Sequence, residues 1–154
     1  MAEQDLTKIL SSVIRRGFPE LLSEDIQIEY QKLRDSLLVY GELTQEGFYI
    51  EVDYALKNAP REALIGGIAH ECAHIIADKV LGRKILSGDA LAYRISSRYK
   101  TLDERNTDVE VILRGFGREL LEFLRYSEKI GLNHYREDGL SSRELEIILG
   151  SMNH

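Results

Sequence analysis

The chain has 154 residues, of which 44% are hydrophobic and 30% charged, and its formal net charge is −6. This length and composition are typical of one globular domain with its own core, spanning residues 1–154. The acidic charge argues against nucleic acid as a partner, because a phosphate-binding surface needs clustered lysine and arginine.

The N-terminal half is predicted to form a helix followed by a small sheet. Apolar residues recur at helical spacing within residues 1–20, and "RRGFPE" ends that helix. Three strand-like runs follow at residues 25–33, 36–43 and 47–56. The turn "TQEG" predicts that the last two form a hairpin. We therefore expect a three-stranded, mostly antiparallel sheet with one apolar face.

The C-terminal half is predicted to be helical. Helices are expected at residues 60–82, 87–100, 101–131 and 142–149. The helix at 101–131 carries an apolar stripe of Val109, Ile112, Leu113, Phe116, Leu120, Phe123 and Leu124. Strands followed by helices predict an α+β fold, in which the sheet packs on the helix at 60–82 and on the long helix.

The expected compartment is the cytoplasm. Cys72 is the single cysteine, which rules out an internal disulfide and fits a reducing environment. The first ten residues lack the basic and apolar regions of a signal peptide, and no apolar stretch is long enough to span a bilayer. We therefore expect no membrane partner.

The segment "IAHECAHIIAD", residues 68–78, places two histidines and a glutamate within an apolar helix. His70 and His74 are four residues apart, so their rings stand one turn apart on a face of small residues, where they could ligate Zn²⁺. Glu71 is rotated off that face, which would keep it out of the ligand sphere but near a metal-bound water. This is the H-E-x-x-H arrangement of zinc peptidases. The alternative is a core helix with two satisfied histidines, and Cys72 is expected to be a core residue.

A catalytic zinc needs a third protein ligand, and Glu104 is the preferred candidate. Glu104 and Asp108 lie four residues apart at the start of the predicted long helix. Glu104 would bind zinc, while Asp108 would accept the free N–H of His70 and fix that ring. The alternative is that Thr101 and Glu104 form an N-terminal capping box. The other candidates considered are Asp89, Asp103, Glu110 and His134.

The pair "HECAH" and "ERNTD" resembles the gluzincin clan of zinc metallopeptidases, and most closely its smallest members, the minigluzincins. The resemblance covers residues 26–125, and its first motif is the more specific one. It implies a zinc endopeptidase with His70, His74 and Glu104 as ligands. It also implies that Glu71 is the general base, and that Asp108 supports a histidine.

The resemblance further implies that a peptide substrate binds along a sheet edge next to the active-site helix. The matching segment is the strand near residues 48–54, which an extended peptide would join by backbone hydrogen bonds. Peptide hydrolysis also needs a group that stabilises the oxyanion. His134 is our candidate, with Tyr135 next, and the alternative is an exposed loop histidine.

The C-terminal tail, residues 136–154, has two interpretations. Minigluzincins are described as latent pro-forms, so the tail could cover the cleft, in the same chain or by self-association, with His154 near zinc. Alternatively, it completes the core as a helix with Ser141 and Glu144 in a capping box and Leu140 and Leu145 as its hydrophobic staple. A different class of function, a non-catalytic zinc-stabilised domain that binds a partner, also stays open.

Overall fold

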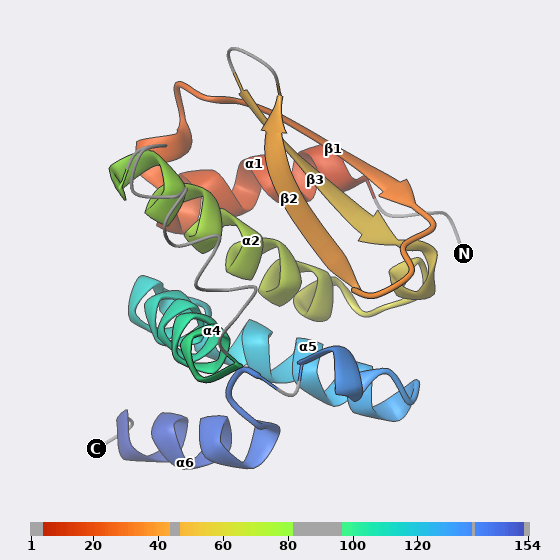
Figure 1. Cartoon of the computed structure of the whole chain (residues 1–154), viewed down its shortest axis with the longest axis vertical. Helices are drawn as coiled ribbons and strands as arrows, with labels where there is room; N and C mark the ends of the chain where they lie inside the picture. Colours follow the sequence, from red (N-terminus) through yellow and green to blue (C-terminus); the bar gives the residue numbers. More distant parts are fainter. Residues whose placement is uncertain (1–4, 44–46, 82–96, 137, 153–154) are drawn as a thin grey trace.

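The computed structural model describes residues 5–43, 47–81, 97–136 and 138–152, and it confirms an α+β fold. The described helices are α1 (Leu6–Gly17), α2 (Arg61–Leu81), α4 (Ser97–Val111), α5 (Gly117–Lys129) and α6 (Ser142–Met152). The sheet, α2, the α4–α5 pair and α6 form successive layers from top to bottom in Figure 1. The helix predicted at 87–100 lies mostly outside the described residues, as does Asp89, and its last four residues belong to α4.

The sheet contains β1 (Asp25–Gln31), β2 (Leu38–Leu43) and β3 (Gly47–Asp53) in the order β1-β3-β2. β2 and β3 are antiparallel, as the predicted hairpin requires. The prediction of a mostly antiparallel sheet is wrong for the other pair, because β1 runs parallel to β3. β1 joins the edge of β3 that β2 leaves open, and at that edge it could have run in either direction. Side-chain alternation does not reveal which edge a strand takes.

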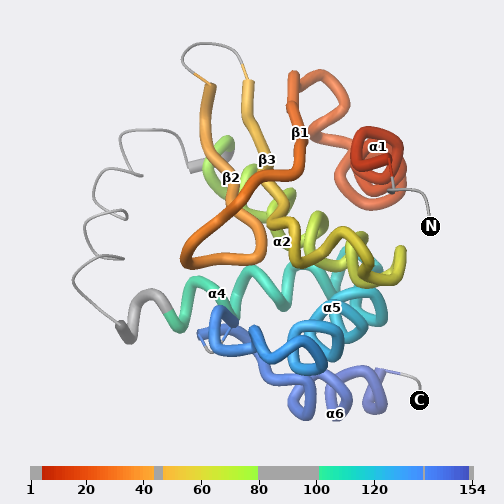
Figure 2. Tube along the Cα trace, turned by 90° about the vertical axis from the view of Figure 1, so that its right-hand side faces the viewer, coloured from red at the N-terminus to blue at the C-terminus, as the bar shows by residue number. Residues whose placement is uncertain are grey.

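α2 is covered on two sides, as its mixture of apolar and small residues predicts. The alternating side chains of β3 that are buried are Phe48, Ile50 and Val52. α2 contacts the sheet on one side and α5 on the other, and α1 packs against α2 and β1 (Figure 2). In the described part of the chain, no helix is long and apolar enough to cross a bilayer.

Gly66 allows α5 to approach α2 closely, because a Cβ at this position would overlap the backbone carbonyl oxygen of Glu119. We expect Gly66→Ala to lower the free energy of unfolding by about 2–3 kcal/mol, since helix backbones would have to separate. Gly150→Ala in α6 is the matched control, because its Cβ would meet nothing within 4 Å. Chemical denaturation should show the control stabilised by about 0.5–1 kcal/mol. Equal effects of the two substitutions would contradict this account.

The single helix predicted over 101–131 is divided in the structure. α4 ends at Val111, a short irregular segment (Ile112–Phe116) follows, and α5 starts at Gly117. Gly115 has φ = 93°, a conformation that favours glycine, and it breaks the helix. Two hydrogen bonds attach the break to α1, from Arg16 to the carbonyl of Gly115 and from Arg114 to the carbonyl of Gly17.

The break changes which residues of the predicted stripe are buried. Ile112, Phe116, Leu120, Phe123 and Leu124 are buried, as expected. Val109 and Leu113 were predicted to be buried, but they are 41% and 70% exposed. α4 instead turns its face with Thr107, Asp108 and Val111 inward.

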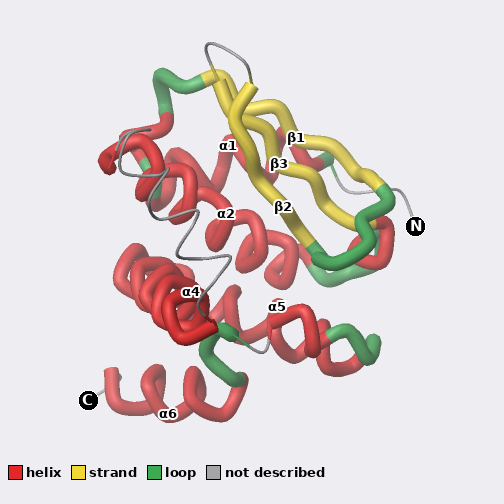
Figure 3. The backbone as a smooth tube through the Cα atoms, viewed as in Figure 1, coloured by secondary structure: helices red, strands yellow, loops and turns green. Residues whose placement is uncertain are grey.

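The described part of the predicted tail forms α6, which packs on α5 on the side away from the sheet (Figures 1 and 3). The predicted capping box is present. The Ser141 N–H donates to the Glu144 carboxylate and the Glu144 N–H to the Ser141 hydroxyl, both at 3.1 Å. Leu140 and Leu145 are buried. These residues therefore complete the core, as the second interpretation of the tail expects, while His154 lies outside the described residues.

Candidate metal centre

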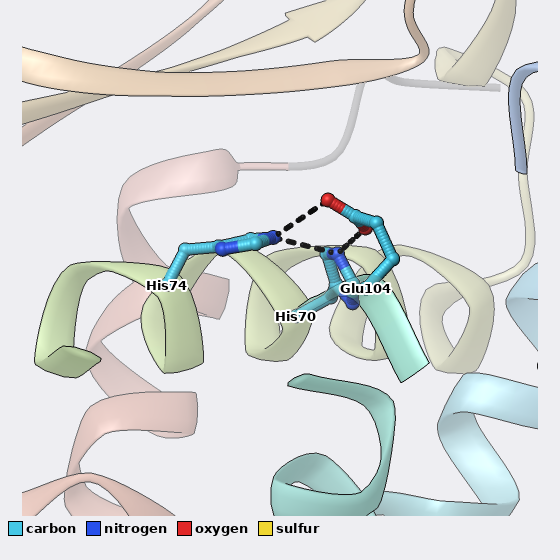
Figure 4. Close-up of side chains that lie close together, drawn as sticks. All are labelled: His70, His74 and Glu104. Atoms are coloured by element: carbon cyan, nitrogen blue, oxygen red, sulfur yellow. Dashed lines mark hydrogen bonds and ion pairs between the residues drawn. The ribbon is translucent and has the colours of Figure 1, made fainter. Parts of the chain in front are cut away.

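The three predicted ligand side chains meet between α2 and α4. His70 and His74 project from α2 toward Glu104 of α4 (Figure 4). The Nε2 atoms of the two histidines are 3.1 Å apart, and the Glu104 carboxylate lies 3.0 Å from His70 Nε2 and 3.3 Å from His74 Nε2. Two ligand atoms bound tetrahedrally at zinc distances are about 3.4 Å apart. The spacing of this group therefore suits one small metal ion.

The alternative role of Glu104 in a capping box is wrong. α4 begins at Ser97, so Thr101 lies inside the helix and not at its N-terminal boundary. The Thr101 hydroxyl donates to the carboxylate of Asp138 at 3.2 Å. Glu104 therefore lies in the middle of α4, and its side chain reaches the two histidines.

Asp108 makes the predicted contact with His70. Its Oδ1 lies 2.7 Å from His70 Nδ1, which leaves Nε2 of that ring directed toward Glu104. Burial would raise the pKa of Asp108, but Arg136 and His70 hold it below its usual range. Burial and the Arg136 guanidinium lower the pKa of His70, but two carboxylates outweigh them and raise it to about 9. Asp108 thus fixes the orientation of the first histidine.

Arg136 also belongs to the centre, although it lies outside both sequence motifs. Its Nη2 donates to both oxygens of Asp108, at 2.9 and 2.8 Å, and the N–H of Leu140 donates to Oδ2 at 2.9 Å. Its Nη1 lies 3.6 Å from the Glu104 carboxylate. A buried, charged aspartate needs hydrogen-bond donors or a cation beside it. The expected burial of Asp108 could therefore have predicted a nearby arginine or lysine.

His134 is not brought to the centre by any contact among the described residues. It is exposed, and its ring lies 4.1 Å from that of Tyr135, whose hydroxyl donates to the carbonyl of Arg34. Both residues belong to the short turn Asn133–Arg136, which directs only its last residue, Arg136, into the centre. The structure therefore gives no support to an oxyanion role for His134 or Tyr135.

Glu71 is buried close to the three predicted ligands, as its position after His70 predicts. Burial raises the pKa of its carboxyl group, while the neighbouring histidines act in the opposite direction. Cys72 is also fully buried, and burial raises the pKa of its thiol. It packs in the hydrophobic core, as predicted.

The centre gathers acidic side chains around the two histidines. Glu71, Glu104 and Asp108 supply three carboxylates, and Arg136 supplies one guanidinium. Two imidazoles and one carboxylate are also a ligand set that zinc accepts.

No family model, curated protein or solved structure matches the chain. The resemblance to gluzincins is therefore carried by the two motifs alone. Of the metal centre, the structure establishes that His70, His74 and Glu104 lie within metal-binding distance of one another.

Proposed function

We propose that this protein is a zinc-dependent endopeptidase of the gluzincin type. The observation that supports the proposal is the convergence of two imidazole nitrogens and a carboxylate oxygen, all within 4.8 Å of one another. A further buried carboxylate, Glu71, follows the first histidine directly. This combination serves hydrolysis as well as metal binding.

His70, His74 and Glu104 would hold the zinc ion. Zinc bound there would act as a Lewis acid and would lower the pKa of a water molecule to about 7. Glu71 would accept the proton of that water and deliver it to the amine that leaves. Asp108, held by Arg136 and the N–H of Leu140, would keep the His70 ring oriented throughout.

The strand expected to bind substrate needs correction. Residues 48–54 fall largely in β3, which is the central strand and is hydrogen-bonded to β1 and to β2 along its two edges. An added peptide strand cannot pair with it. β2 ends the sheet and contacts α2, the helix that carries the histidines. We therefore propose that an extended peptide binds along the outer edge of β2.

The test combines metal analysis with peptide hydrolysis. Purified protein should contain one zinc ion per chain and cleave a quenched fluorescent peptide library. Chelation should abolish cleavage, and added zinc should restore it. Protein that binds no zinc would refute the site. Stoichiometric zinc without cleavage would refute the peptidase and favour the non-catalytic zinc domain.

A further inference from the structure

Tyr40 lies flat against His74. The two rings are stacked, with centroids 5.1 Å apart and an interplanar angle of 10°. Tyr40 comes from β2, whereas His74 comes from α2, so this contact links the sheet to the proposed metal centre. Nearly parallel rings at this centroid distance are offset-stacked, so the phenol ring covers part of the imidazole face.

The two histidines are supported in different ways. The Nδ1 atom of His70 has the Asp108 carboxylate as its partner at 2.7 Å. For His74, the hydrogen bonds recorded among the described residues involve only Nε2, the atom that points toward the other ligands. A hydrogen bond to the second ring nitrogen normally fixes the orientation of a metal-binding histidine. His74 therefore relies on another restraint against rotation about its Cβ–Cγ bond.

Tyr40 is itself well anchored. Its backbone pairs with Ile50 of β3 in the sheet register. Its hydroxyl donates to the Asp78 carboxylate at 3.3 Å, and Asp78 lies one turn after His74 on the same face of α2. The phenol ring is thus held at two points, and rotation of the His74 imidazole would drive its edge into that ring.

We propose that Tyr40 is a positioning residue that fixes the ring plane of His74 for metal binding. The proposal rests on the zinc site of the proposed function, and it adds a support for the second histidine that no motif residue provides. The aromatic face does the positioning, while the hydroxyl only helps to place the ring. Phenylalanine should therefore replace Tyr40, and an aliphatic residue should not.

The experiment measures zinc affinity by competition with a chromophoric chelator, and the visible spectrum of the Co²⁺-substituted protein. Tyr40→Leu should weaken zinc binding about tenfold or more, in the range of lost supporting contacts to metal ligands, and should change the Co²⁺ spectrum. Tyr40→Phe should stay within about threefold of wild type and keep the wild-type spectrum. If Tyr40 acted only through its hydroxyl contact with Asp78, Tyr40→Phe would weaken zinc binding as Tyr40→Leu does. Rescue by phenylalanine would therefore assign the effect to the aromatic ring.

Tyr49→Leu is the matched control, because it removes a tyrosine ring from the same sheet without touching His74. Tyr49 lies on the opposite face of the hairpin, over Gly41, and not among the buried residues of β3. This variant should bind zinc as wild type does. Equal affinities of Tyr40→Leu and wild type, failure of Tyr40→Phe to rescue, or equal weakening by Tyr49→Leu would each overturn the proposal. Zinc binding without peptide cleavage would overturn only the proposed function, whereas absence of zinc binding would overturn both.

Discussion

Glu71→Gln is expected to abolish peptide hydrolysis while leaving zinc bound. Glutamine has the shape of glutamate but cannot accept the proton of the attacking water. General-base catalysis contributes about 10²–10⁴-fold to a rate, so we expect kcat to fall by roughly 10³-fold. Zinc should remain because Glu71 is not one of the three side chains whose ligand atoms converge.

The measurement pairs kcat on a fluorescent peptide with zinc content per chain. Glu119→Gln is the matched control, since this glutamate is also largely buried but pairs with Arg16 at 2.8 Å. It should retain wild-type activity. If Glu71→Gln kept more than about a tenth of wild-type kcat, its role as general base would be refuted.

Glu104→Ala is expected to release the metal. Loss of a group that merely supports a ligand costs about 10–100-fold in affinity, so loss of a direct ligand should exceed about 100-fold. The substitution also leaves the two histidines without the carboxylate that lies 3.0 and 3.3 Å from them. Wild-type protein should gain about 4 kcal/mol of stability when zinc is present at a thousand times its Kd.

Zinc content after dialysis and the zinc-dependent shift in Tm together test this expectation. Glu110→Ala is the control on the same helix, because Glu110 pairs with Arg114 at 2.8 Å and is half exposed. The control should show the wild-type shift in Tm, and Glu104→Ala should show at most about a third of it. Retention of one tightly held zinc ion by Glu104→Ala would remove it from the ligand set.

Three features that depend on spacing within one helix were predicted correctly. His70 and His74 share a face because a helix turns once in about 3.6 residues. The same periodicity brings Asp108 to the face of α4 that also carries Glu104. The Ser141–Glu144 capping box likewise depends only on neighbours along the chain.

Features that depend on how segments pack were predicted less well. The parallel pairing of β1 with β3 depends on the edge and the direction in which β1 joins the hairpin, and both are set by packing. Gly115 could have remained in a continuous helix, but its contacts with α1 stabilise a break there. The turn at residues 133–136 turned Arg136 inward and left His134 exposed.

By itself, the sequence determined which side chains share a helix face, and hence the pairs His70–His74 and Glu104–Asp108, because helical periodicity is a local property. Only the tertiary structure decided which faces meet. Glu104 and Arg136 approach His70 from 34 and 66 residues away along the chain, and Tyr40 reaches His74 from the sheet. These contacts between residues far apart in the sequence depend on how the layers pack. Gly66 and the break at Gly115 position the helices in that packing.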